Sequence, residues 1–184
     1  MSPSKVISCA DEAVADIPDG AVIMVAGYAV PGTPQNLVKA LLAEGVGSLT
    51  CISGPWYGRD PNLYDAARLI ADGRVKKAVT SAPIHPDASN PAIRMWRGGQ
   101  LEVEALPQGT LAERIRAGGA GLGGIFLATG MGTPFEAGKE RKLIDGEEYI
   151  FEMPLKADYA LLRAHKADTL GNLVYRRSQS NWNP

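Results

Sequence analysis

A glycine-rich segment near the N-terminus, residues 26–34, has the composition of a ligand-binding loop. It follows a continuous apolar run at 21–25, and its distinctive residues are Gly27, Tyr28 and Gly32. Glycines let a backbone approach a ligand closely, and free N–H groups at a helix start can hold a carboxylate, a phosphate or a developing oxyanion. A tight turn without a ligand would look the same, and the spacing is neither GxGxxG nor that of a P-loop. The segment is a candidate binding loop whose ligand its spacing does not identify.

Two further segments could contribute polar groups to the same site. A second glycine loop, 129–133, follows an apolar run at 125–128. Ligands of open α/β sheets gather at the carboxyl ends of strands, so we expect this loop at the same sheet edge as the first one. Gln108 precedes a helix start, where its amide could donate to a carbonyl or a carboxylate, or could remain a solvated loop side chain.

The usual catalytic side chains are not arranged for catalysis in this sequence. The two histidines, His85 and His165, belong to no recognisable nucleophile pair and to no metal-ligand cluster. The two cysteines, Cys9 and Cys51, lie far apart outside any CxxC pattern, and both are interpreted as small buried hydrophobic residues. The residue pattern therefore predicts neither a catalytic residue nor a metal site in this chain.

Short apolar runs alternate with amphipathic segments along most of the chain, punctuated by 21 glycines and 13 prolines. Strands are predicted over 21–25, 49–53, 75–80, 101–106 and 125–128, and helices over 34–44, 61–71, 90–98 and 110–117. Thr33 is the expected cap of the first helix, and Thr110 with Glu113 forms a capping box for the last. This alternation is typical of an α/β fold.

The C-terminal third has a different pattern. Asp145 and Gly146 separate two strand-like runs, 141–144 and 148–153, and predict a tight hairpin. Further strands are predicted at 159–162 and 173–175. The fold class is therefore α/β, with a mainly parallel sheet flanked by helices and antiparallel additions near the C-terminus.

Composition and charge exclude several classes of partner. With 184 residues, 45% hydrophobic and a formal net charge of −1, the chain is expected to form one domain over residues 1–184. The balanced charge gives no excess of basic residues that would favour binding to nucleic acid or to an anionic membrane. The first twenty residues lack the apolar core of a signal peptide, and no apolar run reaches membrane-spanning length. A cytoplasmic location is expected.

Several of these motifs resemble the A subunit of family I coenzyme A transferases, of the succinyl-CoA:3-oxoacid and 3-oxoadipate type. Residues 16–34 resemble that family's first signature, in which an Asp-Gly pair, apolar residues, Gly-Gly-Phe and Gly-x-Pro follow one another. The run 99–104 continuing into 107–121 is the most specific match. Segments 166–168, 171–176 and 181–184 resemble the C-terminal part, so the resemblance covers essentially the whole chain and implies a NagB/RpiA/CoA transferase-like fold.

The resemblance implies a mechanism that this chain does not complete alone. In that family a glutamate on the B subunit reacts with an acyl-CoA and forms a glutamyl-CoA thioester, from which a second carboxylate takes the CoA. Coenzyme A is a substrate, and no permanently bound cofactor is expected. The implied partner is a B subunit, in a heterodimer or a heterotetramer. The A subunit supplies one wall of the site, which implies substrate-binding roles for Gly27, Tyr28, Gly32, Gly54 and Gln108.

The sequence departs from the family pattern at three places that bear on specificity. Gly-Gly-Phe has become Ala26-Gly27-Tyr28, and the asparagine of Ser-Asn-Asn-Ala-Gly has become Gly54. The family's Ser-Tyr-x-Gly-Glu-Asn has become residues 81–86, Ser-Ala-Pro-Ile-His-Pro. These changes predict an acyl group other than succinate or acetoacetate.

Two other functions remain open on the sequence. Relatives of this fold hydrolyse or decarboxylate CoA esters, which is the main alternative activity. A ligand-sensing module ranks last, because no DNA-binding helix-turn-helix precedes Asp19. The family also implies a further strand beyond Pro184.

Overall fold

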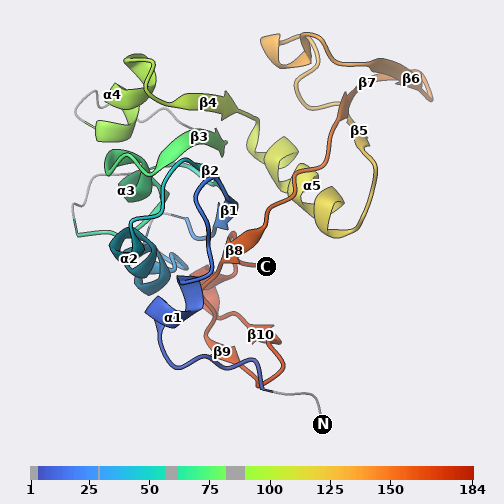
Figure 1. The fold of residues 1–184 in the computed structure, drawn as a ribbon. Coiled ribbons are helices and arrows are strands. Elements are labelled where there is room, and N and C mark those ends of the chain that lie inside the picture. The colour runs from blue at the N-terminus through green and yellow to red at the C-terminus, as the bar shows by residue number, and fades with distance from the viewer. Residues whose placement is uncertain (1–3, 29, 57–61, 82–89) are drawn as a thin grey trace.

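The computed structural model describes residues 4–28, 30–56, 62–81 and 90–184. Within these ranges, five strands form a parallel sheet in the order β4-β3-β2-β1-β8 (Figure 1). They are β1 Val22–Val25, β2 Leu49–Ser53, β3 Val75–Thr80, β4 Glu102–Ala105 and β8 Tyr159–Leu161. The prediction of a mainly parallel sheet is confirmed, and β2 and β3 have the predicted bounds.

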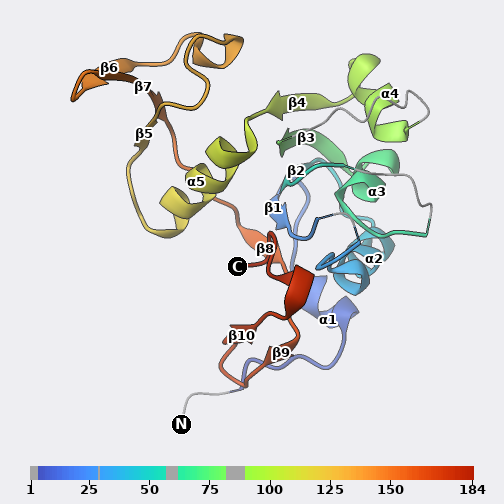
Figure 2. The same ribbon diagram turned by 180° about the vertical axis from the view of Figure 1, so that it is seen from behind.

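Helices cover both faces of this sheet. The described α-helices are α1 Ala10–Val14, α2 Gln35–Glu44, α3 Ala66–Ala71, α4 Pro91–Arg97 and α5 Gln108–Gly119. Helices α2, α3 and α4 connect successive parallel strands and lie on one face, and α5 lies on the other (Figures 1 and 2). None of the helices in the described part of the chain is long and apolar enough to cross a membrane.

The alternation of side chains along each strand divides the core into two layers. Ile23 and Cys51 point toward α2 and α3, where they are fully buried. Their neighbours Met24 and Ile52 point the other way, toward Leu111 of α5. Because successive strand residues face opposite sides, a continuous apolar run supplies both layers at once.

Antiparallel strands make up the C-terminal additions, as predicted. Strands β5 Ile125–Leu127, β7 Glu147–Glu152 and β6 Arg141–Ile144 form one sheet in that order, and β9 Lys166–Ala167 pairs with β10 Leu173–Val174. Short 3-10 helices span Pro134–Glu136 and Arg177–Gln179. Between β6 and β7, Asp145 and Gly146 have φ angles of 50° and 85°, the left-handed conformation that a tight hairpin needs.

Strand β5 contradicts the expectation that it lies in the parallel sheet. It pairs antiparallel with β7 and lies beyond α5, away from β1 (Figures 1 and 2). Its residues are half-buried, and Phe126 contacts Phe151 edge to face with ring centroids 5.2 Å apart. A short apolar run such as 125–128 indicates a strand but carries no information about its partner, which is why the prediction was wrong.

Helix α3 begins later than predicted. The expected helix of residues 61–71 starts at Ala66, and position 61 itself lies outside the described residues. The Asp65 carboxylate accepts a hydrogen bond of 3.0 Å from the backbone N–H of Arg68. This side chain caps the helix and fixes its first turn at that point.

The two predicted threonine caps are also wrong. Helix α2 begins at Gln35 without a side-chain cap, and α5 begins at Gln108, two residues before the predicted capping box. Thr33 and Thr110 are 2% and 0% exposed, so both side chains pack in the interior. Because threonine carries a methyl group as well as a hydroxyl, it can pack in the core, and at both positions it does so and does not cap the helix.

Candidate functional site

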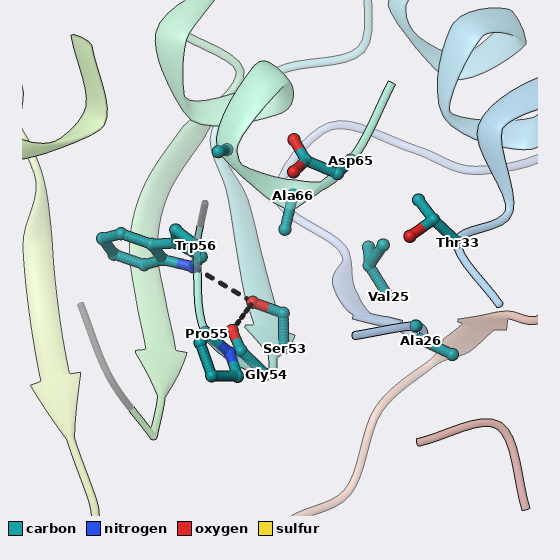
Figure 3. A pocket seen from close by; sticks show the side chains of 11 residues that line it. Val25, Ala26, Thr33, Ser53, Gly54, Pro55, Trp56, Asp65 and Ala66 are labelled. Carbon is teal, nitrogen blue, oxygen red and sulfur yellow. Dashed lines mark hydrogen bonds between the residues drawn. The ribbon is translucent and has the colours of Figure 1, made fainter. Parts of the chain in front are cut away.

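The loops that follow β1 and β2 meet around a small polar cavity at the carboxyl edge of the sheet (Figure 3). Gly27 of the first loop and Gly54 of the second line it, together with Ser53 and Asp65. Its volume is about 20 Å³, which is room for one water molecule. Two of the predicted binding residues therefore lie together at the ends of neighbouring strands, where open α/β sheets bind ligands.

The first loop requires glycine at two positions. Gly27 has a φ of 97°, and a Cβ there would lie 2.6 Å from the backbone nitrogen of Thr33. Gly32 has a φ of 76°, and a Cβ there would overlap the side-chain amide of Asn183. Any other residue would be strained in its backbone and would displace its neighbour. Close packing thus explains these glycines before any ligand is considered.

The second loop is held by a chain of hydrogen bonds after β2. The Trp56 indole Nε1 donates to Ser53 Oγ at 3.1 Å, and Ser53 Oγ donates to the Gly54 carbonyl at 3.2 Å (Figure 3). Thr80 Oγ1, at the end of β3, donates to the same carbonyl at 2.9 Å. Ser53 and Thr80 are buried, so these bonds are protected from water. The Gly54 backbone is therefore fixed, with its carbonyl already engaged.

Asp65 is a site residue that the sequence analysis missed. Burial raises the pKa of its carboxyl group, although hydrogen bonds from the backbone of Arg68 and Ala67 act in the opposite direction. The carboxyl group lines the small cavity on the side opposite Ser53 (Figure 3). An aspartate directly before a helical run is a capping signal, and it was overlooked because the helix was started at position 61.

A larger cavity of about 460 Å³ opens on the α5 side of the same edge. Its floor is formed by the ends of β1, β2 and β8, and α5 forms one wall. Most of the lining side chains are apolar, among them Met24, Ile52, Ile115, Leu162 and Trp182. Glu113 and Arg116 also line it, but they form an exposed ion pair of 2.7 Å with each other. Glu113 is therefore an exposed carboxylate that is paired within its own helix.

The C-terminal segment, residues 181–184, forms the remaining wall and ties the glycine loop in place. Asn181 donates to the Pro31 carbonyl at 3.0 Å, and Asn183 donates to the Gly32 carbonyl at 3.1 Å. Asn183 Oδ1 accepts a 2.8 Å hydrogen bond from the backbone of Arg163, just after β8. These contacts join the loops after β1 and β8, and no local sequence signal marks them.

The other predicted binding residues are more exposed. Tyr28 is 38% exposed, and its backbone N–H donates to the Pro31 carbonyl at 3.1 Å, which closes the turn. Gln108 is exposed in the first turn of α5, at the carboxyl end of β4, and lines neither of these two cavities. Much of segment 81–86, where the sequence departs from the family pattern, lies outside the described residues.

The second glycine loop does not belong to this edge. It follows β5 in the antiparallel sheet, so the prediction that it shares an edge with the first loop is wrong. The Gly132 N–H donates to Glu136 Oε2 at 2.8 Å, and Thr133 Oγ1 donates to the Gly130 carbonyl at 2.6 Å. These internal bonds stabilise a turn of the C-terminal addition.

The thiols and imidazoles play no part in the described site. Cys51 is fully buried, and burial raises its pKa to about 12. Cys9 is exposed, which contradicts the prediction that both cysteines are buried. His165 is exposed near β9, and His85 lies outside the described residues. The described part of the chain contains no cluster of three or more histidine, cysteine, aspartate or glutamate residues that could hold a metal ion.

Sequence comparison identifies close relatives of this chain. The family model described as coenzyme A transferase matches residues 7–184. The chain is 45% identical over 172 residues to the A subunit of the 3-oxoadipate CoA-transferase from Pseudomonas putida. That match covers 94% of this chain and 73% of the relative.

Solved structures share the fold. An acyl-CoA transferase from Escherichia coli O157:H7, in a thioester complex with CoA, matches with a TM-score of 0.78 and 25% identity over 94% of this chain and 37% of that one. A variant of the decarboxylase AibA/AibB matches with a TM-score of 0.76 and 25% identity over 98% of this chain and 70% of that one. The fold thus occurs in proteins of more than one activity.

Proposed function

Because the chain belongs to the coenzyme A transferase family, we propose that it is the A subunit of a two-chain enzyme that transfers CoA between an acyl-CoA and a carboxylate. The observation that carries this proposal is the edge where the loops after β1 and β2 meet. The edge offers loop backbone beside Gly27 and Gly54. Among the described residues, the side-chain carboxylates that line its two cavities are those of Asp65, which caps a helix, and Glu113, which pairs with Arg116 on the surface. A half-site of this kind needs its nucleophile from a partner.

The reaction divides between the two chains. The carboxylate of a glutamate on the B subunit adds to the thioester carbonyl and expels CoA as a thiolate, which leaves a mixed anhydride. The thiolate attacks the glutamyl carbonyl, so the first acid leaves and a glutamyl-CoA thioester forms. An acceptor carboxylate then repeats these two steps in reverse order and departs as the new acyl-CoA.

This chain binds and orients the acyl group during those steps. Backbone N–H groups of Gly27 and Gly32 and the amide of Gln108 are donors for the acyl oxygens, and Tyr28 and Gly54 form part of the surface beside them. Fixed donors stabilise the negative charge that develops on a carbonyl oxygen more strongly than mobile water does. The loop is suited to this role because the C-terminal segment holds it rigidly.

The assembly follows from the same division. We propose that residues 1–184 act as one domain that pairs with a B subunit in a heterodimer or a heterotetramer in the cytoplasm. Coenzyme A enters as a substrate, and no permanently bound cofactor is needed for the steps above.

Co-expression with the B subunit tests the function. The complex is supplied with acyl-CoA donors and a panel of carboxylates, and the B subunit is searched by mass spectrometry for a trapped glutamyl-CoA thioester. Each chain alone should be inactive. Free CoA released without an acceptor carboxylate would favour a hydrolase, and carbon dioxide release would favour a decarboxylase.

A further inference from the structure

Trp182 lies directly against Gly54, although the two residues are far apart in the sequence. A Cβ atom at position 54 would lie 3.0 Å from the indole Nε1 and 3.2 Å from Cε2. Such distances are tighter than ordinary van der Waals contact, so a larger residue at 54 would require the indole to move. The indole therefore occupies the space that a side chain at 54 would take.

The indole is held firmly in this position. One side of it packs against the core layer that contains Ile52 and Leu111, and it also lines the cavity of about 460 Å³. The next residue, Asn183, is 4% exposed and is fixed by hydrogen bonds to the Gly32 carbonyl and the Arg163 backbone. A side chain anchored between a core and a buried neighbour has little freedom to yield to a ligand.

Hydrogen bonds also fix the backbone at position 54. Its carbonyl accepts hydrogen bonds from Thr80 and Ser53, so the backbone cannot withdraw from the indole. The contact between Gly54 and Trp182 is therefore a fixed wall between the edge that Gly27 lines and the cavity beside α5.

We propose that Trp182 is a specificity-determining residue, which with Gly54 sets the size of the acyl group that this half-site accepts. The inference rests on the proposed function, because it requires the acyl group to lie at this edge. A bulky, rigid and mainly apolar ring excludes large acyl groups and gives a flat surface to small ones. The pair acts as a unit: the absence of a side chain at 54 makes room for the indole.

Graded substrates with the A/B complex test this proposal. We expect Trp182→Ala to raise kcat/KM for branched or longer acyl groups, relative to the smallest one, by at least about tenfold, because a single methylene in an apolar pocket is already worth about 10- to 200-fold. Trp182→Phe should shift the preference in the same direction by less. The matched control is Trp96→Phe, which removes the same atoms from α4 on the opposite face of the sheet, and it should leave the preference unchanged.

A double-mutant cycle checks that the two residues act together. Gly54→Ala should lower kcat/KM for every acyl group, and Trp182→Leu should restore much of that loss because it removes Nε1 and Cε2, the two indole atoms nearest to the new methyl group. Independent effects of the two substitutions on kcat/KM would overturn the proposal. This cycle also decides the matter if the Trp182→Ala chain fails to assemble with its partner.

The outcomes separate this inference from the proposed function. If the wild-type complex transfers CoA but Trp182→Phe and the cycle leave the acyl preference unchanged, the role of Trp182 is refuted and the function stands. If the wild-type complex transfers no CoA with any pair of substrates, the proposed function is wrong and the role of Trp182 falls with it.

Discussion

Replacing Arg114 with alanine should strongly destabilise the fold, because this side chain joins α5 to both β4 and β7. Its guanidinium lies 2.8 Å from a carboxylate oxygen of Glu104 and 3.9 Å from one of Glu152. It also donates a hydrogen bond of 2.6 Å to the Met153 carbonyl. The side chains of Arg114 and Glu152 are 11% and 4% exposed, so water cannot take over the contact between these two.

The expected loss is about 3 kcal/mol of unfolding free energy. Breaking a buried ion pair costs about 3–5 kcal/mol, because the remaining charge stays buried without its partner. Glu152 keeps Lys139 as a second partner, which moves the estimate to the lower end of that range. The Glu104 side chain is 34% exposed, so its pair adds less than about 1 kcal/mol after solvent screening.

Urea unfolding followed by circular dichroism measures this loss. The matched control is Arg116→Ala, two residues along the same helix, where an exposed pair with Glu113 is removed and no measurable change is expected. A loss below about 1 kcal/mol for Arg114→Ala would refute the assignment of this pair as buried and strong.

Three further predictions concern the site and its surroundings. Asp65→Asn keeps a helix cap but removes a carboxyl group whose pKa is raised by burial. The wild type should lose stability as the pH rises above 3.8, the ordinary pKa of this carboxyl group, and the variant should not. The unfolding free energy of the variant relative to that of the wild type should therefore increase as the pH rises above 3.8. A difference that stays constant with pH in urea titrations would contradict the burial of Asp65. Iodoacetamide should modify Cys9 but not Cys51 in the native protein, and both in denaturant, as counted by intact mass; native labelling of Cys51 would show that its strand opens. Gln108→Ala should lower turnover of the A/B complex by about three- to tenfold, the worth of one neutral hydrogen bond, with assembly intact, and unchanged kinetics would remove Gln108 from the site.

The parallel sheet could be predicted because its strands carry a strong local signal. β2 is mainly apolar and buried, and β3 is mainly apolar and buried apart from Lys76 and Lys77 at its start, so both are recognised without partner information. β5 is also an apolar run, but its pairing with β7 depends on Phe151 and on a hairpin that comes later in the chain. Strand identity is a local property, and strand partnership is a tertiary one.

The prediction of two helix starts was wrong for a related physical reason. Thr33 and Thr110 have the right type and spacing for caps, yet both side chains are buried. A threonine hydroxyl contributes roughly 1 kcal/mol as a cap, which the packing of a buried methyl group can match. Asp65 has no apolar part to bury in this way, and it does cap its helix.

The site itself could be predicted only in part, and the reason changes which variants are informative. Gly27, Gly32 and Gly54 were singled out as residues beside a substrate, but each one packs against another residue of this chain: Thr33, Asn183 and Trp182 respectively. Substituting any of these glycines alone would disturb the fold of the loop whether or not a substrate binds there, so lost activity in the single variant would prove nothing about binding. The informative changes are therefore those in the packing partners that leave the backbone free to keep its shape. Trp182→Phe is the best of them, because it shortens the wall without adding an atom at position 54.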